Sequence, residues 1–96
     1  MTNVRYKIRE AILHTRFENE AVLLNLESGR YYSMNAVGSR IWSLLSERPR
    51  TLEELLTNIT DEYQISREAA GQDIQALIQD LVKNGLLEPA DERTGL

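Results

Sequence analysis

Residues 20–42, EAVLLNLESGRYYSMNAVGSRIW, constrain the fold more than any other part of the chain. They predict two apolar strands, Ala21 to Leu26 and Arg30 to Met34, joined by a short turn. The turn, Glu27 to Gly29, suits a three-residue hairpin loop in which the glycine takes the left-handed conformation. A loosely alternating segment, Ala11 to Phe17, predicts one more strand before this hairpin.

Helical periodicity begins directly after the last strand and continues through most of the remaining chain. The expected helices run from Ala36 to about Ser46, from the capping box at Thr51 to about Glu62, and from about Arg67 to Asn84. Asn35 and Ser66 are good N-caps for the first and third helices, and Thr51 with Glu54 forms the capping box of the second. Gly85 stands where a helix C-terminus favours a left-handed residue.

This order of elements predicts an α+β fold. We expect a three-stranded antiparallel sheet followed by a three-helix bundle with the outline of a winged helix-turn-helix. The folded domain is expected to span residues 11–88. Residues 1–10 are weakly patterned and predict a flexible lead-in, whereas the polar residues 89–96 predict a disordered tail.

Composition excludes most kinds of catalytic and metal site. The chain has no cysteine, and His14 is its only histidine, so no Cys-based zinc site or histidine pair can form. Glu53 and Glu54 are adjacent, so they point different ways around a helix and cannot bracket one substrate atom. We therefore expect no enzyme activity, metal or cofactor. No apolar run approaches the roughly 20 residues of a membrane span, which favours a soluble cytoplasmic protein without a membrane partner.

The helix-turn-helix outline raises the question of DNA binding. The third helix begins with Arg67, but Glu68 and Asp73 lie in the turns where base contacts would be made. The net charge is −4, so a phosphate backbone would be repelled. The sequence therefore disfavours a nucleic-acid partner.

The last strand offers an edge to which a peptide could add. If Arg30–Met34 closes a small sheet, one row of its N–H and C=O groups is left unpaired. Alternation places Arg30, Tyr32 and Met34 on one side of this strand and Tyr31 and Ser33 on the other. The third helix is the expected neighbour across a trough. Whether Tyr31 or Tyr32 faces a guest stays open, as does the alternative that both are packing residues.

Three runs in the chain carry a resemblance to a known family: EAVLLNLESGRYYSMNAVGSRIWSLL, TLEELL and DIQALIQDLVKNGLL. They strongly resemble pyrroloquinoline quinone biosynthesis protein D, a family whose members are also called RiPP precursor peptide recognition elements (RiPPs are ribosomally synthesised, post-translationally modified peptides). The likeness covers about Ala11 to Leu87. The segment GRYYSMN is most similar to the leader-binding half of split B proteins from lasso peptide clusters.

The resemblance implies that the leader segment of a precursor peptide adds as a fourth strand, beside the third strand and against the third helix. The leader is expected to carry a Tyr-x-x-Pro element that sits in an apolar pocket. The implied partners are a separate cysteine-type leader peptidase and an asparagine-synthetase-like cyclase. The implied leader-binding residues are Val22 and Leu24 in an adjoining pocket, Arg30, Tyr31, Tyr32, Ser33 and Met34 on the pairing strand, and Ala70, Asp73, Leu77, Asp80 and Leu81 on the helix.

Several alternatives stay open at this point. The same fold could act as a peptide chaperone for a radical-SAM enzyme in pyrroloquinoline quinone synthesis, or as a winged-helix DNA-binding regulator. Leu77 and Leu81 could belong to the core instead of the peptide site. Asp73 and Asp80 would favour a leader with Lys or Arg nearby. An exposed strand edge also promotes self-association, so the sequence does not fix the oligomeric state.

Overall fold

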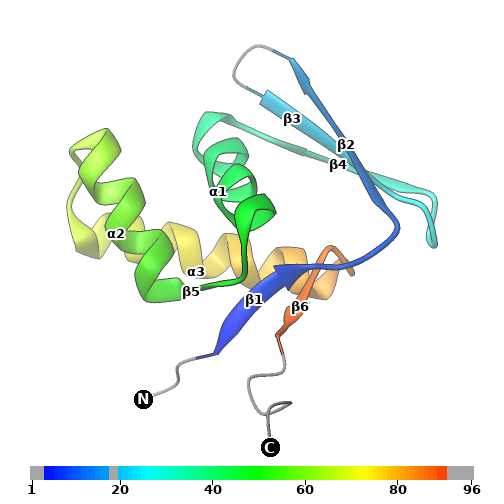
Figure 1. Cartoon of the computed structure of the whole chain (residues 1–96). Helices are drawn as coiled ribbons and strands as arrows, with labels where there is room; N and C mark the ends of the chain where they lie inside the picture. The colour runs from blue at the N-terminus through cyan, green and yellow to red at the C-terminus, as the bar shows by residue number, and fades with distance from the viewer. Residues whose placement is uncertain (1–3, 18–19, 91–96) are drawn as a thin grey trace, which may run out of the picture.

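The computed structural model describes residues 4–17 and 20–90 of the chain. One antiparallel sheet contains, in spatial order, β2 (Ile12–Phe17), β3 (Glu20–Asn25) and β4 (Arg30–Met34) (Figure 1). The helices that follow are α1 (Ala36–Glu47), α2 (Leu52–Tyr63) and α3 (Arg67–Lys83). This arrangement confirms the predicted α+β fold, in which an antiparallel sheet precedes three helices.

Each helix begins at the cap that the sequence predicts. The Oδ1 atom of Asn35 accepts a hydrogen bond of 3.0 Å from the backbone N–H of Gly38. Ser66 accepts a bond from the first turn of α3 in the same way. Thr51 and Glu54 form the capping box reciprocally, with bonds of 3.1 Å and 2.9 Å between side chain and backbone. These contacts satisfy N–H groups that have no partner within a first helical turn.

The side chain of Asn25 ties the β3–β4 hairpin to the end of α3. It is only 6% exposed, and its Oδ1 atom accepts bonds from the backbone N–H groups of Glu27 (2.9 Å) and Ser28 (3.2 Å). Its Nδ2 atom donates to the carbonyl oxygen of Gly85 at 3.2 Å. Gly29 closes the hairpin with a φ of +74°, which only glycine adopts at low cost. One buried amide thereby fixes the hairpin against α3.

A second sheet contains short strands in the order β5 (Arg50–Thr51), β1 (Arg5–Ile8) and β6 (Leu87–Pro89). The expectation of a flexible lead-in over residues 1–10 is therefore wrong for Arg5–Ile8, and Pro89 belongs to a strand instead of a disordered tail. The partners of β1 lie far away in the sequence, so local patterning could not reveal this pairing. Residues 1–3 and 91–96 lie outside the described part of the chain.

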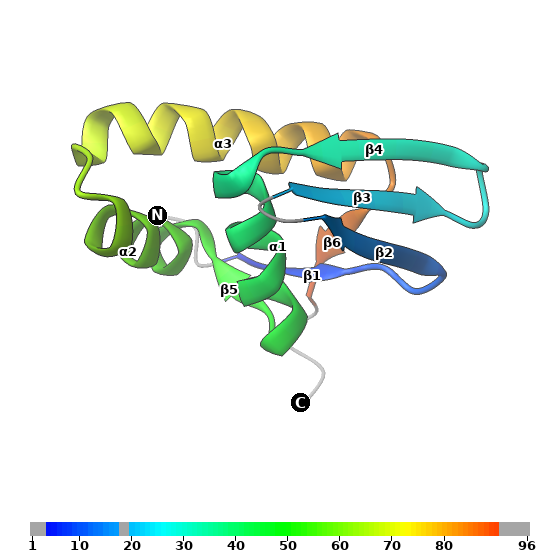
Figure 2. The same cartoon turned by 90° about the horizontal axis from the view of Figure 1, so that it is seen from above.

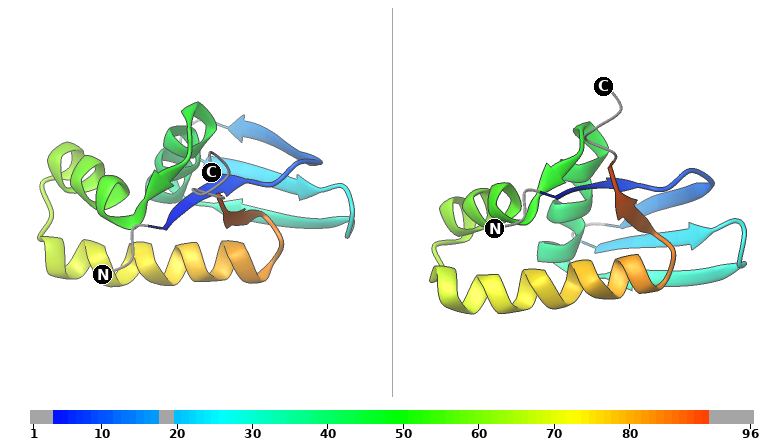
Figure 3. Two further views of the ribbon diagram at one scale, coloured as in Figure 1. Left: turned by 60° about the horizontal axis from the view of Figure 1, so that its bottom comes forward. Right: turned by 90° about the horizontal axis from the view of Figure 1, so that it is seen from below.

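Both sheets and all three helices contribute to one apolar core. Its fully buried large side chains are Leu23, Ile41, Leu55, Ile59, Ile78, Leu81, Leu86 and Leu87. Figure 2 shows α1 between the β2–β3–β4 sheet and α2, while α3 runs alongside β4. The views in Figure 3 show the same neighbours from below. Within the described residues, no helix combines the length and apolar character that crossing a bilayer requires.

Candidate functional site

Strand β4 is an edge strand, and α3 lies beside its open edge. It pairs with β3 on one side, from Asn25↔Arg30 to Ala21↔Met34, and no strand of the described residues pairs with its other side. An unpaired edge presents a row of backbone donors and acceptors to any extended segment that approaches it. Helix α3 overlaps β4 when seen from above (Figure 2), and the hydroxyl of Tyr32 on β4 reaches Asp80 on α3. The region between β4 and α3, with one cavity near each end of the strand, is called the groove below.

The side chains of β4 alternate as predicted, which decides which tyrosine faces α3. Met34 is buried at 5% exposure, and the hydroxyl of Tyr32 donates a hydrogen bond of 2.7 Å to Oδ2 of Asp80 on α3. Tyr31 points to the other face of the sheet and is 73% exposed, and Ser33 is exposed as well. Tyr32 is therefore the tyrosine of the groove.

The contact between Tyr32 and Asp80 bridges the middle of the groove. Partial burial, the hydrogen bond and the negative charge of the carboxylate together raise the pKa of Tyr32 to about 12. The phenol therefore stays a neutral donor at physiological pH. It connects the two walls of the groove at a point where a guest strand would lie.

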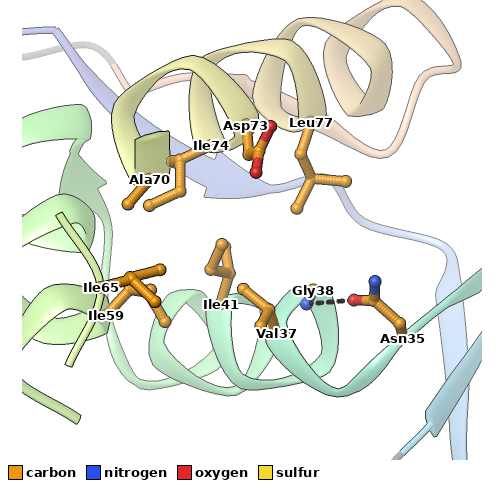
Figure 4. Close-up of a pocket in the computed structure, with 10 residues that line it drawn as sticks. All are labelled: Asn35, Val37, Gly38, Ile41, Ile59, Ile65, Ala70, Asp73, Ile74 and Leu77. Atoms are coloured by element: carbon orange, nitrogen blue, oxygen red, sulfur yellow. Dashed lines mark hydrogen bonds between the residues drawn. The ribbon is translucent and has the colours of Figure 1, made fainter. Parts of the chain in front are cut away.

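An apolar cavity of about 250 Å³ lies at the end of the groove where β4 passes into α1. Figure 4 shows Asp73 and Leu77 pointing from α3 toward Val37 and Ile41 of α1. Ala70, Ile74, Ile59, Ile65, Asn35 and Gly38 complete its lining. The cavity offers space for an apolar or aromatic side chain, with the Asp73 carboxylate as a polar group on its wall.

The opposite end of the groove, beside the hairpin, has a polar and mostly basic lining. Here a cavity of about 460 Å³ is lined by Arg9, Asn25, Glu27, Ser28, Arg30, Lys83, Asn84 and Gly85. The two ends of the groove therefore differ in chemistry, one being apolar and the other charged.

Some of the residues predicted for the site lie elsewhere. Val22 and Leu24 pair with Ser33 and Tyr31, so their side chains lie on the outer face of the sheet and do not line a pocket beside α3. Leu81 is fully buried in the core, with 0% exposure. Ala70, Asp73 and Leu77 line the apolar cavity, Arg30 lines the cavity beside the hairpin, and Tyr32 and Asp80 meet between them. Met34 is buried, and Tyr31 and Ser33 point to the other face of the sheet.

Sequence reasoning missed the contributions of α1 and of the chain before the hairpin. In the sequence, Val37 and Ile41 show only the helical spacing that is typical of core residues, and only the fold places them on a cavity wall opposite α3. Arg9 lies in the predicted lead-in, yet it reaches the basic end of the groove. In the sequence, the available sign of that cavity is a basic residue at the start of β4, Arg30, and another at the end of α3, Lys83.

The outer face of the sheet is apolar and uncovered within the described residues. Leu13, Leu24 and Tyr31 stand opposite one another across the three strands. Leu13 is 55% exposed and Leu26, in the hairpin, is 52% exposed. This surface is separate from the groove, although Tyr31 belongs to the strand that forms the groove edge.

The described residues hold no cluster of three or more His, Asp or Glu side chains that could bind a metal ion.

The sequence profile of the family described as coenzyme PQQ synthesis protein D (PqqD) matches residues 20–87. The chain belongs to the PqqD family. The match contains both strands of the hairpin and all three helices, and it confirms the resemblance found in the sequence.

Two solved structures are similar to this PqqD-family chain over most of its length. One, described as TbiB1 in complex with the TbiA(beta) leader peptide, is 37% identical with a TM-score of 0.80, and the match covers 90% of this chain and 99% of that one. The other, a lasso peptide synthetase B1 complexed with the leader peptide, is 29% identical with a TM-score of 0.72 and coverages of 88% and 98%. A comparison with curated protein sequences finds no match.

Proposed function

We propose that this chain binds the leader segment of a ribosomal precursor peptide in lasso peptide biosynthesis and catalyses no reaction itself. The observation that carries the proposal is the open edge of β4 beside α3, in a chain 37% identical to a protein solved with a leader peptide. The fold, the family and the absence of cysteine support the same assignment.

The proposed mechanism is strand addition. The leader pairs its backbone with Arg30–Met34, which supplies affinity that tolerates changes in leader sequence. Side chains on one face of the leader point into the groove and meet Tyr32 and the apolar cavity at Val37 and Leu77. Alternate leader residues point away, so specificity resides in every second position.

The bound leader would then be delivered to processing enzymes. From the resemblance to split lasso B proteins, we propose a separate cysteine-type peptidase that removes the leader and an asparagine-synthetase-like cyclase that closes the ring. A protein that holds the leader as a strand leaves the core peptide free to enter such enzymes. We also propose that the chain binds the leader in the cytoplasm, where precursor peptides are made.

The description of the family favours one second candidate, a peptide chaperone in coenzyme PQQ synthesis. Binding to a lasso leader but not to a PQQ precursor would exclude it, and the reverse preference would establish it. A regulator that binds DNA is less compatible with the groove, since α3 is bridged to β4 through Tyr32 and carries Asp73 and Asp80 on its exposed surface.

The test is a titration of the chain into a fluorescein-labelled leader peptide of a lasso precursor, followed by fluorescence anisotropy. Tyr32→Ala should weaken binding about tenfold, because it removes both groove area and the bridge to α3. Tyr31→Ala is the matched control on the same strand and should bind almost as the parent does. Proline substitutions in the leader should weaken binding only at alternate positions, where an N–H is needed. Absence of saturable binding would refute the proposal.

A further inference from the structure

The cavity at the hairpin end of the groove is lined by three cationic residues, Arg9, Arg30 and Lys83, and by one anionic residue, Glu27. Arg30 is the first residue of β4 and Lys83 is the last residue of α3, so the two cations flank the groove from its opposite walls. The chain as a whole has a net charge of −4. A basic lining at this one place is therefore not a general property of the protein surface.

The acidic groups nearest to this end make their contacts with other residues. Glu27 lies 3.4 Å from Arg9, and Asp80, one turn before Lys83, accepts the neutral hydroxyl of Tyr32 and keeps its negative charge. Within the part of the chain that the structure describes, neither Arg30 nor Lys83 forms an ion pair with a carboxylate. Both cations are exposed and remain available to a guest.

We infer that Arg30 and Lys83 form an ionic subsite that takes an acidic side chain of the bound peptide, an inference that rests on the proposed function. A carboxylate between the two walls would receive charge-assisted hydrogen bonds from both, and the planar guanidinium of Arg30 is suited to bidentate pairing. Lys83 also lies at the helix C-terminus, where the negative end of the helix dipole keeps its cation in place.

The position of the subsite determines how far apart, and in which order, the acidic and apolar residues of the guest peptide must lie. Arg30, at one end of β4, and Met34, which directly precedes Asn35 of the apolar cavity lining, are four residues apart, which is about 13 Å of extended chain. They lie on the same face as Tyr32, so the acidic residue and the apolar anchor of the guest must also share a face. We therefore expect an even separation of about four to six residues. An antiparallel guest, which continues the pattern of this sheet, carries its acid C-terminal to its apolar anchor.

The test compares neutralised variants of the protein with neutralised variants of the leader. Arg30→Gln and Lys83→Gln should each weaken binding of the labelled leader about threefold, because exposed ion pairs contribute modestly. The loss should shrink when salt is raised from about 0.05 M to about 0.5 M. Arg48→Gln, an equal change of charge on the turn after α1, is the matched control and should leave the affinity unchanged.

Each Asp or Glu of the leader is then replaced singly by its amide. Neutralising the one acid that occupies the subsite should abolish the effect of Arg30→Gln, whereas neutralising any other should not. Arg30→Glu together with Lys at that leader position should restore binding. If the leader binds but the double variant of Arg30 and Lys83 matches the parent at low salt, the subsite is refuted and the proposed function stands. If the parent does not bind the leader, the proposed function itself fails.

Discussion

The hydroxyl of Tyr32 on β4 donates a hydrogen bond of 2.7 Å to the carboxylate of Asp80 on α3, 48 positions further along the chain. No other side-chain bond between the described residues joins β4 to α3. This contact, the bond from Asn25 to Gly85 at the hairpin, and the core beneath them together hold β4 against α3.

The first prediction concerns the ionisation of this phenol. The pKa of Tyr32 is raised from 10.0 to about 12, so its contribution to stability is complete below pH 10.0 and is lost as the pH rises to about 12. An absorbance titration in the near ultraviolet should show one tyrosine that ionises last. That step should disappear in Tyr32→Phe and persist in Tyr31→Phe. Disappearance in the second variant instead would contradict the assignment.

The second prediction concerns two glycines that should respond oppositely to the same change. At Gly38 an added Cβ would lie 3.0 Å from Cβ of Met34, which is attached to the backbone and cannot swing away. At Gly71 the nearest atom would be a methyl of Leu56 at 3.9 Å, an ordinary contact. Gly38→Ala should therefore destabilise the fold by about 1 kcal/mol. Gly71→Ala should stabilise it by about 0.5–1 kcal/mol, as helix propensity requires. Urea denaturation measures both.

The third prediction concerns Asn25. Asn25→Ala should cost about 2 kcal/mol, because it leaves the N–H groups of the hairpin and the carbonyl of Gly85 without their buried partner. Asn84→Ala changes the same residue type at an exposed site one position before Gly85 and should cost less than about 0.5 kcal/mol. Equal losses in thermal denaturation would show that Asn25 has no special role.

The fourth prediction separates the groove from the core on α3. Leu81 is fully buried, so Leu81→Ala should cost about 2–5 kcal/mol of stability. Leu77 is half-buried on the wall of the apolar cavity, so Leu77→Ala should cost much less stability but weaken leader binding roughly fivefold. Denaturation and anisotropy measured on both variants decide this. If Leu81→Ala stays fully folded but no longer binds the leader, Leu81 belongs to the peptide site and its assignment to the core alone is wrong.

The fifth prediction concerns how the stability of the fold changes at acidic pH. The backbone N–H of Thr51 and the guanidinium of Arg5 hold the pKa of Glu54 below its ordinary value of 4.5, against the opposing effect of burial. The resulting stabilisation is present above that value and is lost as the pH falls through the lower pKa of the folded state. Glu54→Gln keeps the capping box but removes the charge, so it should reduce stability by about 0.5 kcal/mol at pH 7, with the difference vanishing in acid. Glu53→Gln, which removes an equal charge from the same turn and breaks only an exposed pair with Arg67, is the control.

Much of this fold was predictable because its signals are local. Asn35, the capping box at Thr51 and the turn glycine Gly29 act through neighbours within a few residues, so sequence patterns placed β4 and all three helices closely. The strand Arg5–Ile8 was missed because its partners are residues 50–51 and 87–89, and nothing local reports such pairing.

The site was predictable only in part for the same reason. Alternation along β4 correctly groups Tyr32 with Arg30 and Met34, because strand geometry alone determines which residues share a face. Which of the two tyrosines faces α3 depends on where the helix lies. The resemblance implied a pocket at Val22 and Leu24, but these two residues lie on the outer face of the sheet, while Ala21 and Leu23 fill the core. Leu77 and Leu81 are spaced so that they share one face of the helix. Only the position of α1 shows that Leu77 lines the cavity while Leu81 belongs to the core.

The bond between Asn25 and Gly85 holds the hairpin end of β4, and the passage of the chain into α1, whose first turn Asn35 caps, holds the other end. The edge strand is therefore fixed at both ends before any guest arrives. A peptide that adds to it finds an ordered template, so the entropy lost on binding is mostly that of the peptide.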